Sequence, residues 1–407
     1  MNNNRLNYTL GLVLAGLAMS LAGCVNPSPQ PTASGDALDR AQSLLQAEAT
    51  RAEAHLRVFR LGVVPDGTGL LLTGEVDTVE ARLNAAHLLR GLGVAVREHV
   101  IVLPTQEMGS NVWGIACLSV ASAREGPEHK AEMGTQILMG GVVRVLKRNG
   151  IWYHVQAADG YLAWLEKGTF IRCTESQMHA WTNSALLLVT AMEDRILSRP
   201  DPEAEPVSDV VIANLVRRVA ETPDWYEVEL PDGRKGWLRK ASAEEYASWI
   251  KCRDPKPENL ERTARGFLGR PYLWGGNSPK GLDCSGFTKL VYGLNGIDLR
   301  RNAAHQARQG VEVPVSSFDQ LKTGDLLFFG RRGFAGRPDR VTHVGIYLRD
   351  KLFIHSSERV QINSLDPGST RRDERRISNL LYARRVLPEA NPVSSAGVSP
   401  PDAHKSH

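Results

Sequence analysis

The stretch PYLWGGNSPKGLDCSGF, residues 271–287, places a cysteine where a helix is expected to begin. After Asp283, apolar residues recur at the spacing of one buried helix face (Phe287, Leu290, Val291 and Leu294). Asp283 suits the N-cap of that helix. Free N–H groups and the positive end of the helix dipole favour a thiolate in the first turn. Cys284 is therefore a candidate nucleophile, and the same N–H groups could receive an oxyanion.

A base for this nucleophile is expected about sixty residues later in the chain. Alternating apolar residues in THVGIYL, residues 342–348, predict a strand, and Arg349–Lys351 predict a turn into a second strand, LFIHS. If the turn holds three residues, His355 faces Gly345 and His343 lies diagonally from His355 on the same face. The pattern thus brings two imidazoles together, and the glycine leaves room for them.

These motifs resemble those of the NlpC-type cysteine peptidases of bacterial cell walls. The resemblance covers roughly 255–387 and consists of five blocks in the family's order: Tyr272-x-Trp274-Gly275-Gly276, Asp283-Cys284-Ser285-Gly286-Phe287, Thr323-Gly324-Asp325-Leu326, His343-Val344-Gly345-Ile346-Tyr347, and His355. It implies an α+β fold with a papain-like catalytic domain over 255–387.

The resemblance also implies a role for each site residue. Cys284 attacks, His343 accepts and returns the proton, and His355 orients His343. Tyr272 and the Cys284 amide bind the oxyanion, while Asp283 and Ser285 hold the dipeptide portion of the substrate. We expect Trp274 to pack under the loop.

An internal repeat precedes this domain. Trp152-Tyr153-His154-Val155, Asp159-Gly160 and Trp164-Leu165 return 73 residues later as Trp225-Tyr226-Glu227-Val228, Asp232-Gly233 and Trp237-Leu238. Each copy predicts two strands joined by an Asp-Gly turn, with the aromatic residues in the core. The copies resemble bacterial SH3-like (SH3b) barrels, at 110–173 and 182–248.

In wall peptidases with two such barrels, the first barrel leans over the catalytic groove. The resemblance then implies that Glu132 meets the free amine of the substrate's L-Ala and that Tyr161 helps to wall the pocket. A desolvated carboxylate paired with an ammonium discriminates strongly against a blocked amine. The alternative is that Glu132 is a solvated turn residue.

The N-terminal region predicts export. Residues 1–24 combine one charge, Arg5, with an apolar run that ends in Leu21-Ala22-Gly23-Cys24. This resembles the signal peptide of bacterial lipoproteins, in which the cysteine, here Cys24, becomes lipidated and anchors the protein to a membrane of the cell envelope. A plain secretory signal is the alternative. Residues 25–36 form a Pro-rich tether, and 388–407 a tail expected to be disordered.

Residues 37–105 predict a small α+β module. A helix is expected over 37–56, a strand at 70–76, a helix at 80–90 that Gly91 stops, and a strand at 94–102. The module loosely resembles BON domains; an unclassified spacer is the alternative. It contains no nucleophile constellation, so we expect it to position or attach the enzyme.

The net charge and the number of cysteines bear on possible partners and on disulfide bonds. A net charge of +4 over 407 residues gives nucleic-acid binding no support. Five cysteines in a chain this long do not make a disulfide framework, although Cys117 and Cys173 could pair across a small domain.

The sequence therefore predicts a cysteine endopeptidase that needs no cofactor or metal. The expected substrates are peptidoglycan-derived peptides with a free N-terminal L-Ala, cut between γ-D-Glu and the diamino acid, in wall recycling. The alternatives are an amidase or endopeptidase acting on polymeric wall, a zinc site of Cys284, His343 and His355, and a non-catalytic wall-binding lipoprotein.

One block departs from the family pattern. Asn302 and Ala304 replace an acid and a serine that relatives often carry, so the subsite they line could differ. His305 beside them is a rival base, but no strand pattern directs it at Cys284; an exposed surface histidine is the simpler interpretation.

Overall fold

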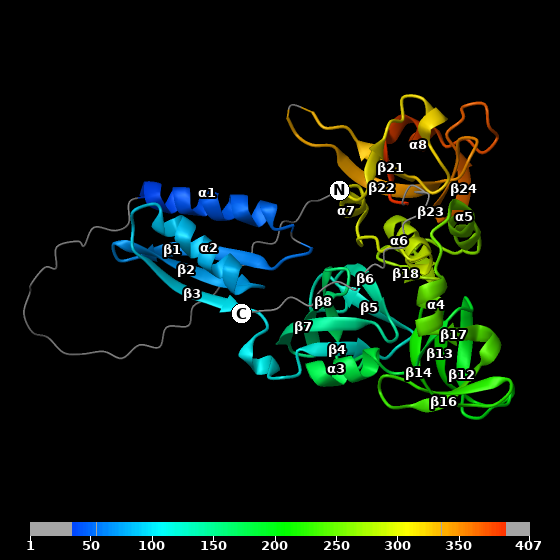
Figure 1. The fold of residues 1–407 in the computed structure, drawn as a ribbon. Helices are drawn as coiled ribbons and strands as arrows, with labels where there is room; N and C mark the ends of the chain where they lie inside the picture. Colours follow the sequence, from blue (N-terminus) through cyan, green and yellow to red (C-terminus); the bar gives the residue numbers. More distant parts are fainter. Residues whose placement is uncertain (1–34, 54, 335, 388–407) are drawn as a thin grey trace, which may run out of the picture.

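The computed structural model describes residues 35–387 except 54 and 335. The expected signal peptide with Cys24, most of the 25–36 tether and the 388–407 tail lie outside these residues. Within the described part of the chain, no helix has the length and apolarity needed to span a membrane. Figure 1 shows an N-terminal module on one side, two β-rich units below, and a mixed unit of helices and strands at the upper right.

The N-terminal module packs two helices on a three-stranded sheet. Helices α1 (Gly35–Arg51) and α2 (Val79–Arg90) accompany strands β1 (Phe59–Asp66), β2 (Gly69–Val76) and β3 (Val96–Val102), in the order β1-β2-β3. The connection through α2 makes β2 and β3 parallel, and Thr78 caps α2 by accepting the Ala81 N–H. The predicted strands and second helix are confirmed, but the first helix ends at Arg51, five residues early.

The next two units are each a seven-stranded antiparallel sheet. The first contains β4 (Trp113–Ala116), β5 (Val120–Arg124), β6 (Met133–Leu138), β7 (Val142–Asn149), β8 (Trp152–Ala157), β9 (Leu162–Glu166) and β10 (Phe170–Cys173). After α3 (Glu175–Thr182), the second contains β11 (Leu186–Val189), β12 (Glu193–Leu197), β13 (Pro206–Val211), β14 (Leu215–Glu221), β15 (Trp225–Glu229), β16 (Lys235–Arg239) and β17 (Ala243–Glu245). The two repeated hairpins are confirmed as β8–β9 and β15–β16.

The two copies of the repeat differ in how they bury their aromatic residues. In the first, Trp152 and Trp164 are buried, as predicted for core residues. In the second, Trp225 and Trp237 are only half-buried, so the prediction that both sets lie in the core is wrong for these two tryptophans, although Tyr226 packs against the core. Leu187, Val216, Val228 and Leu238 form the second core instead.

The last unit places one helix across a six-stranded sheet. It comprises α4 (Tyr246–Cys252), α5 (Pro257–Arg265), β18 (Asn277–Ser278), β19 (Gly281–Leu282), α6 (Cys284–Leu294), α7 (Ala303–Gln306), β20 (Val311–Val313), β21 (Leu326–Arg331), β22 (Arg340–Tyr347), β23 (Leu352–Ser357), β24 (Arg359–Ser364), α8 (Glu374–Asn379) and β25 (Leu380–Arg385). The sheet order is β20-β25-β21-β22-β23-β24.

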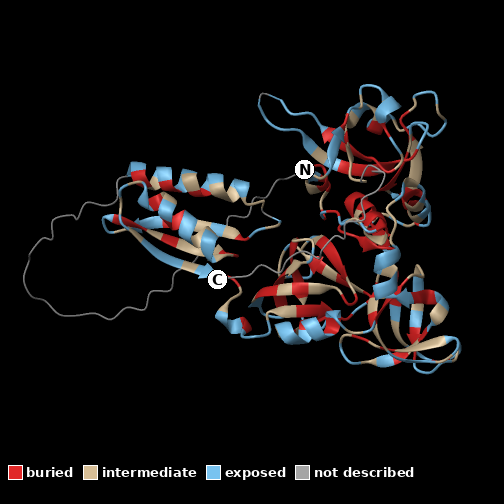
Figure 2. Ribbon diagram, viewed as in Figure 1, coloured by how far each residue is buried: buried red, intermediate tan, exposed pale blue. Residues whose placement is uncertain are grey.

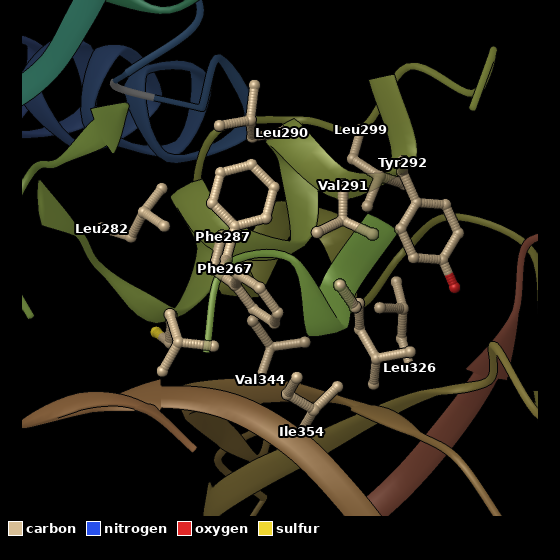
Figure 3. Close-up of a cluster of buried hydrophobic side chains, with 14 of the residues drawn as sticks. Phe267, Leu282, Phe287, Leu290, Val291, Tyr292, Leu299, Leu326, Val344 and Ile354 are labelled. Atoms are coloured by element: carbon tan, nitrogen blue, oxygen red, sulfur yellow. The ribbon is translucent and has the colours of Figure 1, made fainter. Parts of the chain in front are cut away.

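The apolar face of α6 holds this unit together. Phe287, Leu290 and Val291 are buried against Val344 and Ile354 of the sheet (Figure 3), and burying such side chains contributes about 1.5–3 kcal/mol each. Figure 2 shows α6 among the buried elements of the unit. Because the helix begins at Cys284, packing its apolar face on the sheet also places this cysteine beside the central strands.

Besides Cys284, the cysteines that the structure describes carry free thiols. Cys117 and Cys173 are buried and unlinked, and Cys252 is exposed. The alternative of a Cys117–Cys173 disulfide is therefore wrong.

Candidate active site

Cys284 is the first residue of α6, as predicted. Asp283 is its N-cap and accepts the Gly286 N–H at 2.7 Å. The environment of the thiol nevertheless differs from the expectation of a thiolate. Burial, followed by the nearby charge of Asp283, raises the pKa of Cys284 to about 11, although backbone N–H groups at Val344 and Ser285 act in the opposite direction. Burial therefore outweighs the helix N-terminus and favours the neutral thiol.

The two histidines meet as the strand pattern predicts. Strands β22 and β23 pair with Ile346 opposite Ile354, which sets His355 opposite Gly345. The Nε2 of His343 lies 2.8 Å from the Nδ1 of His355, with the rings perpendicular. A methyl group on Gly345 would come within 3.1 Å of the His355 Cβ, so the glycine does leave the room that the ring requires.

A third side chain, Asn363 of β24, completes this row. Its Oδ1 lies 3.1 Å from the Nε2 of His355. An amide oxygen only accepts, so His355 carries its hydrogen on Nε2 and accepts the His343 Nε2–H on Nδ1. This leaves the lone pair of His343 on Nδ1. Because both nitrogens of His355 are engaged, the alternative of a zinc site would require breaking this row.

Burial keeps both imidazoles neutral. It lowers the pKa of His343 well below its ordinary value and that of His355 to about 4, and the charge of Arg376 adds to both effects. Arg376 and Asn363 are not among the residues that the sequence motifs predict for this site. Asn363 could have been found by continuing the strand alternation, because it pairs with Phe353, two residues from His355. Arg376 lies on a short helix, and nothing in its sequence pattern points to the site.

Cys284 opens into a cleft of about 590 Å³. The catalytic unit lines it with Tyr272, Trp274, Gly275, Asp283, Cys284, Ser285, Asn302, Ala303, Ala304, Arg340, Val341 and Thr342; the first barrel contributes Glu125, Glu132, Gly134 and Tyr161; the N-terminal module contributes His55. Trp274 is 60% exposed, so the prediction that it packs under the loop is wrong.

The predicted substrate-binding residues fall into two groups. Glu132 and Tyr161 lie on the barrel side of the cleft; Glu132 is exposed, whereas Tyr161 is buried and donates its hydroxyl to Glu125 Oε1 at 2.7 Å. Tyr272 lies on the side of Cys284, and burial together with the charges at Cys284 and Asp283 raises its pKa. The structure brings all three to one cleft, and their roles stay predictions.

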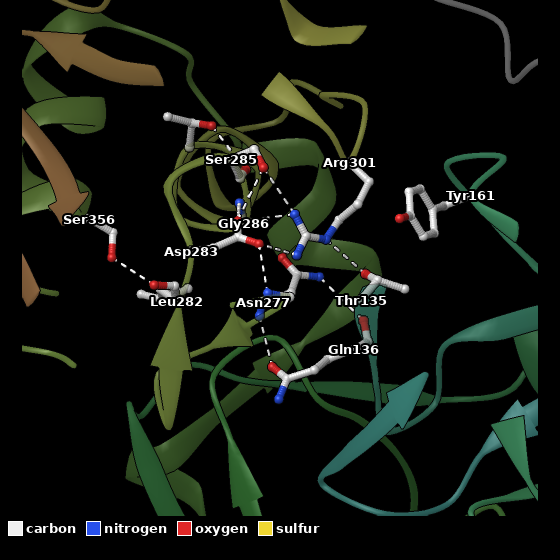
Figure 4. A network of polar contacts seen from close by, with 12 residues as sticks. Thr135, Gln136, Tyr161, Asn277, Leu282, Asp283, Ser285, Gly286, Arg301 and Ser356 are labelled. Atoms are coloured by element: carbon white, nitrogen blue, oxygen red, sulfur yellow. Dashed lines mark hydrogen bonds and ion pairs between the residues drawn. The ribbon is translucent and has the colours of Figure 1, made fainter. Parts of the chain in front are cut away.

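Asp283 and Ser285 belong to a buried network (Figure 4). Arg301, 1% exposed, donates to both carboxylate oxygens of Asp283 at 3.1 and 2.6 Å. Asp283 also accepts the Gly275 N–H and the Ser285 hydroxyl. With these bonds and the N-cap bond, the carboxylate is fully engaged. The geometry therefore gives Asp283 a positioning role, and its expected contact with substrate stays a prediction.

The same network joins the catalytic unit to the first barrel. The Nε of Arg301 donates to the Thr135 hydroxyl at 2.9 Å, and the Asn277 N–H donates to the Gln136 Oε1 at 2.8 Å. All four side chains are buried. The barrel is thus fixed over the cleft by paired polar groups rather than by a flexible linker.

His305 does not line the cleft. Its side chain is 12% exposed and lies 4.0 Å from Glu53, so the expectation of an exposed histidine is wrong. Asn302 and Ala304, the two departures from the family pattern, do line the cleft.

Comparison with known proteins agrees with this geometry. The NlpC/P60 family model matches residues 269–376, and the model for the bacterial dipeptidyl-peptidase Sh3 domain matches residues 123–168. A gamma-D-glutamyl-L-lysine dipeptidyl-peptidase of Bacillus cereus is 32% identical over 266 residues, which cover 63% of this chain and 76% of the relative. The chain belongs to the NlpC/P60 family.

Two further similarities each cover about two thirds of this chain. Dipeptidyl-peptidase 6 of Lysinibacillus sphaericus is 27% identical, over 62% of this chain and 91% of that relative. The crystal structure of an NlpC/P60 family protein from Bacillus cereus superposes with a TM-score of 0.58 at 27% identity, and covers 68% of this chain and all of the other. The predicted α+β fold, with a papain-like catalytic domain and SH3-like barrels, is confirmed. The protein is a cysteine peptidase of the cell-wall hydrolase family, which places it outside the cytoplasm or in the envelope.

Proposed function

We propose that this protein hydrolyses the bond between γ-D-Glu and the diamino acid in peptidoglycan-derived peptides that carry a free N-terminal L-Ala. The observation that carries the proposal is the cleft itself: Cys284 lies on one side, and Glu132, Glu125 and Tyr161 lie on the barrel side. Carboxylates at that end suit an ammonium group. The Bacillus cereus relative, named as a gamma-D-glutamyl-L-lysine dipeptidyl-peptidase, supports the same cut.

Glu132 is the carboxylate best placed for the amine. Its side chain is exposed to the cleft and has no hydrogen bond or ion pair within the described part of the chain. Glu125, by contrast, is held by the Tyr161 hydroxyl and lies 3.7 Å from the Nδ1 of His55. An acetyl group on the amine would remove its charge and leave Glu132 without a partner, which discriminates against blocked peptides.

The chemical step starts from two neutral groups. As the Cys284 sulfur attacks the carbonyl carbon, the Nδ1 of His343 takes the thiol proton, while His355 and Asn363 hold the imidazole in this tautomer. Tyr272 and the Cys284 N–H receive the oxyanion. His343 then gives the proton to the leaving amine, and a water molecule hydrolyses the resulting thioester.

We also propose that the mature protein is anchored by lipid at Cys24 and acts in recycling of wall peptides at the envelope. The support is the motif Leu21-Ala22-Gly23-Cys24 in the sequence. Replacing Cys24 with alanine should abolish labelling by a palmitate analogue in cells and release the protein from membranes.

One assay separates the proposed cut from its alternatives. Purified protein is incubated with L-Ala-γ-D-Glu-L-Lys, with its N-acetylated form and with intact peptidoglycan, and products are identified by mass. We expect L-Ala-D-Glu and lysine from the free peptide only, and no product from Cys284→Ala, whose fold is checked by circular dichroism. Glu132→Gln should lower kcat/KM about tenfold or more on the free peptide. Release of stem peptides from polymer, or equal cleavage of both peptides, would contradict the proposal.

A further inference from the structure

A loop of the N-terminal module reaches the cleft. It follows α1 and spans residues 52–57, of which residue 54 is not described. The His55 carbonyl accepts the Leu162 N–H at 2.8 Å, and the Leu56 carbonyl accepts the Gln156 amide at 2.9 Å. On its other side, Glu53 forms an ion pair with Arg308, just beyond α7. The loop therefore contacts both the first barrel and the catalytic domain.

The module that carries this loop is itself fixed to the barrel. The ammonium of Lys147 lies 2.7 Å from both carboxylate oxygens of Glu75, and both side chains are largely buried. An apolar cluster spans the same boundary, formed by Val58, Leu103, Leu146 and Leu162. Arg57 ties the loop back to the module through two bonds to Asp77, at 2.7 and 3.1 Å. The loop is thus held from both ends.

The side chain of His55 faces the cleft. Its ring lies parallel to that of Tyr161, with an interplanar angle of 5° and 5.4 Å between centroids. Its Nδ1 is 3.7 Å from the Oε2 of Glu125, and the side chain is 46% exposed. A module without any catalytic residue therefore supplies part of the cleft wall, beside Glu125 and Tyr161 and in the same cleft as Glu132, the group that the proposed function assigns to the free amine.

We propose that His55 is a specificity-determining residue that closes the amine end of the cleft. This inference rests on the proposed function. The imidazole occupies the space that an acyl group or a further residue on the L-Ala nitrogen would need, and it packs on Tyr161 beside Glu125. Specificity of this kind comes from a steric block against the wrong substrate as well as from contacts to the right one.

The test uses the full chain with three variants. His55→Ala removes the imidazole from the side of the cleft, and His55→Phe keeps a flat ring there. His99→Ala is the matched control, since His99 is exposed on β3 of the same module. We measure kcat and KM on L-Ala-γ-D-Glu-L-Lys and on its N-acetylated form. For His55→Ala we expect the preference for the free peptide, taken as the ratio of the two kcat/KM values, to fall about tenfold. His55→Phe and His99→Ala should keep the wild-type preference.

Arg308→Ala gives an independent route to the same result. It removes the ion pair between the loop and the residue just beyond α7 without altering a cleft residue. The preference should shift in the same direction, but by less than in His55→Ala, because the loop keeps its bonds to the first barrel. If His55→Ala does not fold, the substrate preference of Arg308→Ala is measured in its place. An unchanged preference in both His55→Ala and Arg308→Ala would overturn the inference while the proposed function stands.

A second measurement separates failure of the inference from failure of the proposed function. If the wild type cleaves neither peptide, the proposed function is wrong. The steric block by His55 is then tested by labelling Cys284. The rates of modification by iodoacetamide and by the bulky fluorescein maleimide are measured by mass on the Cys284 peptide. His55→Ala should raise the bulky-to-small rate ratio about tenfold. Equal ratios in wild type and His55→Ala would overturn the inference.

Discussion

At the scale of single residues, burial outweighs the favourable position of the Cys284 sulfur at the start of its helix. Burial raises the pKa of Cys284 to about 11 and lowers that of His343, so both shifts favour the neutral forms. We expect alkylation of Cys284 by iodoacetamide to accelerate steadily from pH 6 to pH 10. Rates are read by mass on the Cys284 peptide, with the exposed Cys252 as internal reference. A rate plateau below pH 7 would instead reveal a thiolate–imidazolium pair.

Asn363 fixes the tautomers of both imidazoles through a single acceptor. Asn363→Ala removes it, so His355 can place its hydrogen on either nitrogen, and we expect kcat to fall at least tenfold with little change in KM. Asn363→Asp keeps the acceptor and adds negative charge, which raises the pKa of His355. Its activity should survive near pH 7 but decline at a higher pH on acidification than the wild type. Wild-type kcat in Asn363→Ala would contradict this role.

At the scale of elements, the β22–β23 pair depends on a glycine. A Cβ at Gly345 would meet the His355 Cβ at 3.1 Å and the Ile354 carbonyl at 3.2 Å. Gly345→Ala should therefore push the strands apart, destabilise the protein by about 1–3 kcal/mol and lower kcat by moving His355. Urea titrations and steady-state kinetics measure both effects.

The strand control for this variant is Gly62→Ala in β1. Its nearest neighbour, the Thr73 hydroxyl oxygen, would lie 3.9 Å from the new Cβ. Neither stability nor kcat should fall in this variant. Equal losses in both variants would show that the effect at Gly345 is a general property of glycine in strands.

The elements around the nucleophile were predictable because local patterns determine them. Alternation and a three-residue turn set the register that brings His343 to His355, and the apolar stripe after Asp283 sets the start of α6. Trp274 shows where prediction from local patterns ends. Its loop has no periodicity, so residue type alone suggested burial for a side chain that is exposed. Arg376 could not be found, because the docking of α8 depends on tertiary contacts.

At the scale of the whole molecule, the repeat predicted two barrels but not how the first one docks. Its position depends on side-chain pairs that are remote in sequence, such as Arg301 with Thr135 and His55 with Tyr161. Such contacts leave no periodic signal. The prediction of a thiolate at Cys284 is not supported for a related reason. Local sequence determines where the helix starts, whereas the burial that raises the thiol pKa comes from the assembled fold.

The docking contact can be tested at Thr135. Thr135→Val keeps the shape but removes the acceptor, and leaves the Nε of the buried Arg301 unpaired. We expect a loss of about 1–3 kcal/mol in the free energy of unfolding, together with lower activity, because Arg301 also holds Asp283. Thr135→Ser keeps the hydroxyl and should retain most of both. A fully stable and active Thr135→Val would mean that the barrel is held by its other contacts.

Three buried histidines in two domains make the whole molecule sensitive to acid. Burial lowers the pKa of His343, that of His355 to about 4, and that of His154, in the first barrel, to about 3. Below pH 6.5 the unfolded chain binds protons that the folded chain does not, so the free energy of unfolding falls as pH falls. Each group contributes about 1.4 kcal/mol per pH unit until the pH reaches its folded pKa. Urea titrations at pH 7, 6 and 5 should show this slope, and His154→Phe should reduce it by about 1.4 kcal/mol per pH unit. A stability independent of pH over this range would mean that these imidazoles titrate normally in the folded protein.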